Sequence, residues 1–113
     1  MTARTKLLVA PPYAVEQTLK SFGANLRTAR LRRNLTLEDV AQKIGTRRAA
    51  VADAEKGKPS TAIAVYLAIL WSLDLLEPIN DVAAPETDTE GRTLAMARER
   101  SRARPKIEPD DEP

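Results

Sequence analysis

The feature that most constrains this chain is a pair of short apolar patterns of helical period, each followed by a glycine. The first pattern covers residues 37–44 and stops at Gly45, and the second covers about residues 47–56 and stops at Gly57. Glycine is common just past a helix end because it adopts the left-handed conformation without steric cost. Helices this short are unstable alone in water, so they must bury their apolar faces against neighbours. We therefore expect an all-α domain in which a tight turn joins two short helices.

Longer helices are expected on both sides of this pair. Apolar residues at three- and four-residue spacing predict a helix over residues 13–33, with a possible break at Gly23: Val15, Leu19, Phe22, Leu26 and Ala29. Asn34 tolerates the left-handed conformation and should end this helix. Residues 62–73 predict a further helix that is apolar on most of its surface, so it must be largely buried.

Side chains that can cap helices precede three of these segments. Thr36 begins a Thr-Leu-Glu-Asp run with the form of a capping box, in which Thr36 and Asp39 each satisfy the other's backbone N–H. Thr46 is the nearest capping candidate for the helix that follows Gly45. Ser60 or Thr61 is the candidate for the helix over residues 62–73.

The chain is expected to have three parts. Residues 1–12 form an irregular N-terminal arm that ends in two prolines. Residues 13–82 form one compact domain of four to five helices, with residues 75–82 available for a short fifth helix. Residues 83–113 form a flexible extension that is helical over residues 90–104 and disordered over the acidic, proline-rich residues 105–113.

The net charge of +2 conceals a strong asymmetry along the chain. Residues 25–58 carry nine basic and four acidic side chains, whereas residues 59–84 carry three acidic side chains and no basic ones. A local excess of lysine and arginine is what a phosphate-binding surface requires, because each cation that neutralises a phosphate releases counterions. A solvated surface of mixed charge is the alternative interpretation.

Two short helices joined by a tight turn match a helix-turn-helix unit within residues 26–73, whose second helix enters the DNA major groove. Ala41 is small enough to let the helices cross closely, and Val51 fills the space between them. Long hydrogen-bond donors suit the acceptors of guanine, and small side chains suit the methyl group of thymine. The second helix presents both kinds of side chain on its outward face. These outward residues are Arg47, Arg48, Ala49, Ala52, Asp53 and Lys56. A plain solvated helix face is the competing interpretation.

The combined pattern resembles the Xre/Cro family of helix-turn-helix regulators over about residues 25–74. The residues that carry this resemblance are Leu26, Arg30, Leu35, Thr36, Glu38, Val40, Ala41, Ile44, Gly45, Val51, Glu55, Gly57, Pro59, Leu67, Leu70 and Leu73. The resemblance implies a structural salt bridge between Arg30 and Glu55, and DNA contacts from positions 37, 48, 49 and 53.

This sequence departs from the family pattern at three positions. Leu37 replaces a frequent glutamine, which weakens the expectation of a DNA contact there. Arg47 stands where the family often has a capping serine, and Ala54 replaces a larger apolar residue. Lys56 and Lys58, beside the second glycine stop, are expected to touch phosphate.

One such unit covers few base pairs, so a homodimer on a pseudo-palindromic double-stranded operator is the expected arrangement. The apolar excess at the end of the domain predicts the dimer interface: Val65, Ile69, Leu73, Leu75, Leu76 and Ile79. Trp71 is expected in the core or in this interface.

The segment after the core is similar to HipB-like antitoxins, which implies autoregulation of an operator and binding of a HipA-like kinase toxin. The similarity rests on residues 70–76, a proline-bounded linker, and residues 88–100 with Gly91, Arg92 and Leu94. A stand-alone regulator without a toxin partner is the alternative, with residues 85–113 then an inert tail.

Other function classes find little support in the sequence. The chain has no cysteine and no histidine, which removes the commonest metal ligands and the commonest general acid near neutral pH. It has no phosphate-binding glycine loop or supported carboxylate pair, so we expect no catalytic site, no metal and no cofactor. No apolar stretch reaches membrane-spanning length, and the expected location is the cytoplasm.

Overall fold

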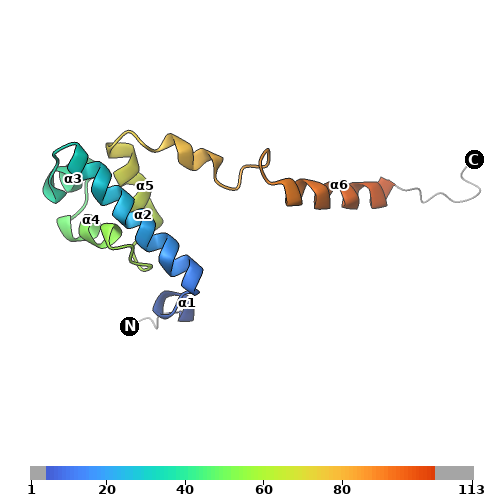
Figure 1. Cartoon of the computed structure of the whole chain (residues 1–113), viewed down its shortest axis with the longest axis horizontal. Coiled ribbons are helices and arrows are strands. Elements are labelled where there is room, and N and C mark those ends of the chain that lie inside the picture. Colours follow the sequence, from blue (N-terminus) through green and yellow to red (C-terminus); the bar gives the residue numbers. More distant parts are fainter. Residues whose placement is uncertain (1–4, 104–113) are drawn as a thin grey trace, which may run out of the picture. The chain divides into compact units, whose positions relative to one another are not determined.

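The computed structural model describes residues 5–103 and divides the chain into two compact units (Figure 1). The first unit ends at Leu76 and the second begins at Glu77, so the division lies earlier than the boundary expected after residue 82. Every regular element in the described residues is helical, which confirms the predicted all-α class.

Within residues 5–76, the first unit contains five helices. They are α1 (Lys6–Val9), α2 (Tyr13–Arg32), α3 (Leu37–Ile44), α4 (Arg48–Glu55) and α5 (Ile63–Ser72). The prediction that residues 1–12 are wholly irregular was wrong at α1, because Thr5 caps this turn by accepting a hydrogen bond from the Leu8 N–H at 3.4 Å.

The ends of the predicted helices mostly lie where the stop residues placed them. Asn34 has a φ of 57°, Gly45 of 77° and Gly57 of 72°, so all three adopt the left-handed conformation. The capping box before α3 is complete: Asp39 N–H donates to Thr36 Oγ1 at 3.0 Å, and Thr36 N–H donates to Asp39 Oδ2 at 2.8 Å.

Two expected caps are not made. The residue before α4 is Arg47 rather than Thr46, and the residue before α5 is Ala62 rather than Ser60 or Thr61. Neither Arg47 nor Ala62 makes a side-chain capping bond. Both residues have the extended backbone of a position before a helix, but neither side chain has an oxygen that could accept a capping hydrogen bond.

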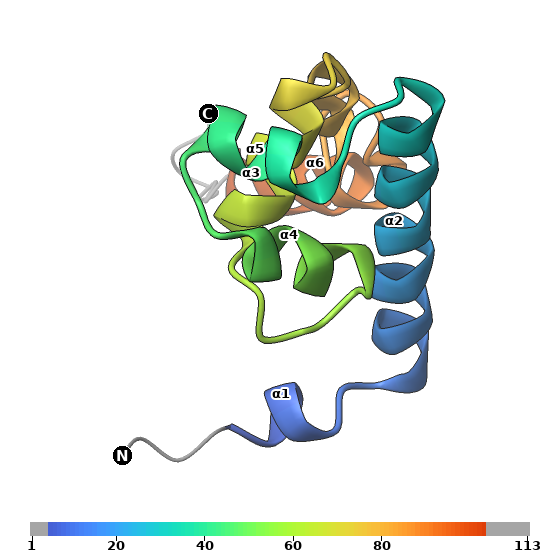
Figure 2. The same cartoon turned by 90° about the vertical axis from the view of Figure 1, so that its left-hand side faces the viewer.

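The core of the first unit lies where α3, α4 and α5 pack together and α4 packs on α2 (Figure 2). Ala41 and Val51 are fully buried, as the helix-turn-helix interpretation required. The other buried apolar residues are Leu26, Val40, Ala54, Tyr66, Ile69, Leu70 and Leu73. Burying a side chain such as leucine or valine contributes about 1.5–3 kcal/mol, so these residues account for much of the stability.

Gly23 does not break α2, which continues through it. A Cβ placed there would lie 2.5 Å from the Glu55 carbonyl oxygen and 2.6 Å from that of Ala54. The glycine therefore allows the end of α4 to approach the backbone of α2. The propensity cost inside the helix is offset by this close packing.

The second unit contains a 3₁₀ helix, η1 (Glu77–Asp81), and the helix α6 (Thr89–Ala103). Neither element has a buried residue. Asp88 precedes α6 and accepts a hydrogen bond from the Gly91 N–H at 3.0 Å. The predicted helix over residues 90–104 is thus present within the described residues, whereas the prediction for residues 105–113 lies outside them.

Candidate nucleic-acid interface

A buried ion pair fixes the position of α4 against α2. Arg30 donates through Nε to Glu55 Oε2 at 2.6 Å and through its second terminal nitrogen to Oε1 at 2.9 Å, with the two side chains only 8% and 6% exposed. Arg30 also donates to the Leu35 carbonyl at 2.8 Å, which ties the segment before α3 to the same guanidinium. The hydrogen bonds that Arg30 donates to the Glu55 carboxylate raise the pKa of Arg30 above its ordinary value. This bidentate pair confirms the salt bridge that the family resemblance implied.

The helix α4 presents most of its predicted contact residues to solvent. Arg47, Arg48 and Ala49 are exposed, and Ala52 and Asp53 are half-buried. Residues three and four positions apart lie on one side of a helix, so residues 48, 49, 52 and 53 share the outward side of α4. Lys56 and Lys58 lie beyond the end of α4 and are also exposed.

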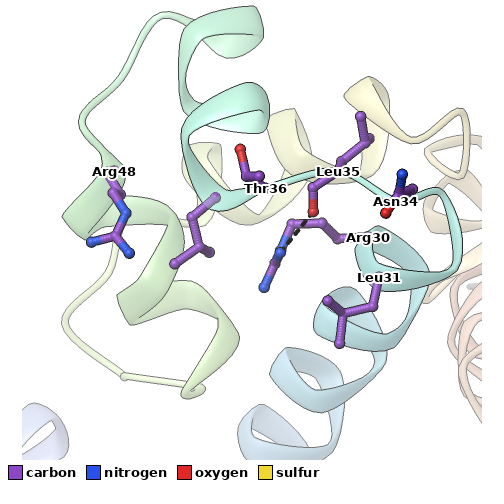
Figure 3. Close-up of a pocket in the computed structure, with 7 residues that line it drawn as sticks. Arg30, Leu31, Asn34, Leu35, Thr36 and Arg48 are labelled. Atoms are coloured by element: carbon purple, nitrogen blue, oxygen red, sulfur yellow. Dashed lines mark hydrogen bonds between the residues drawn. The ribbon is translucent and has the colours of Figure 1, made fainter.

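An open pocket of about 360 Å³ lies between the start of α4, the start of α3 and the end of α2 (Figure 3). Arg48 and Leu37 both line it, together with Arg30, Leu31, Asn34, Leu35 and Thr36. The structure therefore brings together two residues, one from each helix of the unit, that the family resemblance assigned to DNA contact. Leu37 is half-buried and offers this surface an apolar side chain in place of a donor.

An interaction that the sequence analysis did not predict holds Asp53. Lys58 Nζ lies 3.2 Å from Asp53 Oδ1, so Asp53 is paired with a lysine that was expected to touch phosphate. The five-residue separation spans the turn at Gly57, and helix periodicity does not extend through such a turn. A basic residue shortly after a glycine stop is the only signal that the sequence offers for this pair.

The predicted dimer interface needs correction. Ile69 is fully buried and Leu73 is 2% exposed, so both belong to the core of the single chain and offer no surface to a second subunit. Val65 and Leu76 are half-buried, Leu75 is 37% exposed, and Ile79 is half-buried in the second unit.

Trp71 lies outside the core, with 55% of its surface exposed. Lys43 Nζ lies 5.7 Å from the centre of its ring and donates to the Ser72 carbonyl at 3.2 Å. A cation near the end of α5 satisfies a carbonyl that has no partner within the helix. Lys43 therefore joins the end of α5 to α3.

Residues 26–70 match the helix-turn-helix family model. No match was found among curated proteins or among solved structures. The matched span begins within α2 and ends within α5, and it includes the turn at Gly45, the buried ion pair and the outward side of α4. Residues 26–70 thus form a helix-turn-helix domain of the Xre/Cro-like kind, which supports a DNA-binding role in the regulation of transcription. Within residues 5–103, no helix has the length and apolar character needed to cross a membrane.

Proposed function

We propose that this protein is a sequence-specific repressor that places α4 in the major groove of a pseudo-palindromic operator. The observation that carries the proposal is the shared pocket of Arg48 and Leu37, which joins the starts of the two helices of the unit on one exposed surface. In helix-turn-helix proteins the N-terminal residues of the second helix contact base edges. Arg48 is the first residue of α4 and is exposed.

Each predicted contact has a distinct role in this proposal. Arg48 donates to the two acceptors of a guanine, and Ala49 and Ala52 lie against thymine methyl groups. Arg47 and Lys56 neutralise phosphates and hold the register of the domain on the duplex. Leu37 contributes an apolar contact rather than a hydrogen bond to the DNA backbone.

A footprint on the DNA upstream of the protein's own gene tests the proposal. We expect two protected half-sites whose centres lie about 10 base pairs apart, or a multiple of that distance. Protection that is no stronger than on random DNA of the same length would contradict sequence-specific repression.

We propose that the operator-bound form is a homodimer. Ile69 and Leu73 are buried and do not take part in this interface. The homodimer is supported by Trp71 and Leu75, which leave apolar surface exposed at the end of α5 and just beyond it. Leu75→Glu should give a monomer in sedimentation equilibrium at micromolar concentration. Ile63→Glu is the matched control at the other end of α5, where Ile63 is 63% exposed, and should leave the dimer intact. A monomeric wild type with undiminished operator binding would contradict the dimer.

A second candidate function is that of an autoregulatory antitoxin that also binds a HipA-like kinase toxin. The observation that favours it is α6, a helix of 15 residues without a buried residue of its own. A helix that makes no core is available to a protein partner. Co-expression with the product of the adjacent gene should yield a complex that a chain ending at Leu76 does not form. Failure of the full chain to bind that product would favour the stand-alone regulator.

A further inference from the structure

An ion pair at the end of α4 joins the outward side of this helix to the turn that follows it. Lys58 Nζ and Asp53 Oδ1 lie 3.2 Å apart, and the two side chains remain 48% and 38% exposed. The backbone N–H of Lys58 also donates to the Asp53 carbonyl at 3.2 Å. The backbone bond holds the two residues side by side even when their side chains separate.

The core supports this pair through Tyr66. The Tyr66 hydroxyl donates to the Lys58 carbonyl at 2.8 Å, and the Tyr66 ring, which is 1% exposed, stacks on Phe22 with centroids 5.2 Å apart. Burial, and then the negative charge of Asp53, raise the pKa of Tyr66. The backbone of Lys58 is therefore held by a buried anchor, whereas its side chain remains exposed to solvent.

The negative charge of Asp53 has two opposing effects on a helix that contacts DNA bases. A carboxylate near the duplex is repelled by phosphates, yet it accepts a hydrogen bond from the amino group of cytosine. A lysine can neutralise either this carboxylate or a phosphate, and each phosphate contact adds to the release of counterions. The position of Lys58 therefore affects both binding strength and sequence discrimination.

We propose that Lys58 is a specificity-determining residue: it masks Asp53 in the free protein and on random DNA, and turns to a phosphate only where a cytosine amino group replaces it on Asp53. This inference rests on the proposed function, because it requires that α4 faces the base edges. On random DNA, the pair stays closed and Lys58 contributes no phosphate contact. On a matching site, cytosine satisfies Asp53 and Lys58 strengthens the complex.

The salt dependence of binding to a random duplex tests this inference without knowledge of the operator. Asp53→Asn removes the charge while keeping the shape, so it should free Lys58 for phosphate. The slope of log affinity against log salt should then steepen by about 0.9, the value for one added phosphate contact. In a Lys58→Met background, Asp53→Asn should leave the slope unchanged because no ammonium group is freed.

Lys56 provides the matched control. It is exposed, it lies two residues from Lys58, and no ion pair involving it occurs within residues 5–103. In a Lys56→Met background, Asp53→Asn should still steepen the slope by the same amount. Lys58→Gln is a second uncharged variant, and circular dichroism verifies that each protein is folded.

Two results would count against the inference, and they are distinguishable. Equal slopes for wild type and Asp53→Asn, with random DNA still bound, would overturn the role of Lys58 and leave the proposed repressor intact. A folded wild type that binds no duplex even at low salt would overturn both.

Discussion

Arg30 and Glu55 illustrate how much a single buried pair contributes to this fold. Loss of one partner leaves an uncompensated charge in the core, so Glu55→Gln should lower the free energy of unfolding by about 3–5 kcal/mol. The exposed pair of Glu16 and Lys20, whose side chains are 42% and 57% exposed, is the matched control. Glu16→Gln should cost about 0.5 kcal/mol or less. Urea unfolding measures both, and equal effects would show that the buried pair has no special role.

Gly23 and Gly45 are required for different physical reasons. A Cβ at Gly23 meets the carbonyls of Ala54 and Glu55, whereas a Cβ at Gly45 meets nothing within 4 Å. Gly23→Ala should therefore destabilise the fold by about 1–3 kcal/mol through overpacking. Gly45→Ala should cost about 1–2 kcal/mol through its left-handed backbone alone. Thermal unfolding compares them, and a Gly23→Ala variant at least as stable as wild type would refute the close approach of α2 and α4.

Sequence reasoning was reliable for residues whose role follows from a local rule or a family pattern. Arg30, Glu55, Ala41 and Val51 occupy the roles expected of them. The pairing of Asp53 with Lys58 was missed because it depends on the geometry of the turn between them. Ile69 and Leu73 were misplaced because apolar character alone does not distinguish a residue buried in its own core from one buried by a partner.

At the scale of elements, α3 is the helix whose start is best defined. The backbone N–H and side chain of Thr36 stabilise the Asp39 carboxylate and hold its pKa below the ordinary value of 3.8. A lowered pKa in the folded state means that this contribution is complete above the ordinary pKa and is lost as the pH falls below it. We expect the stability of the wild type to decrease through this acidic range more than that of Asp39→Asn. Identical pH dependence, measured by urea unfolding from pH 6 to pH 2, would contradict the capping box.

The starts of α4 and α5 could not be predicted from capping preference. Thr46, Ser60 and Thr61 have side chains suited to capping, yet the helices begin after Arg47 and Ala62. Capping preference is worth about 1 kcal/mol, and packing of the following helix outweighs it. Thr46→Ala removes no capping bond, so it should change the free energy of unfolding by about 0.5 kcal/mol or less. Thr36→Ala should cost about 1 kcal/mol in the same urea experiment.

At the scale of the molecule, the chain separates into a DNA-binding unit and a second unit with little core. The compact unit ends at Leu76, and α6 contributes no buried residue. A chain ending at Leu76 should therefore keep the melting temperature and DNA affinity of the full chain. A large loss of either would show that the second unit supports the first. The sequence placed this boundary at residue 82 because the apolar residues after α5 resemble core residues, although η1 buries none of them.

The proposal that α4 reads base edges through Arg48 is tested most directly by measuring the DNA affinity of two variants on two duplexes, the operator and a random sequence. Arg48→Ala should weaken binding to the footprinted operator by about 1–3 kcal/mol, and should weaken binding to random duplex much less. Lys56→Ala, which removes a predicted phosphate contact, should weaken binding to both duplexes about equally. Undiminished operator affinity in Arg48→Ala, or a loss equal on both duplexes, would contradict the claim.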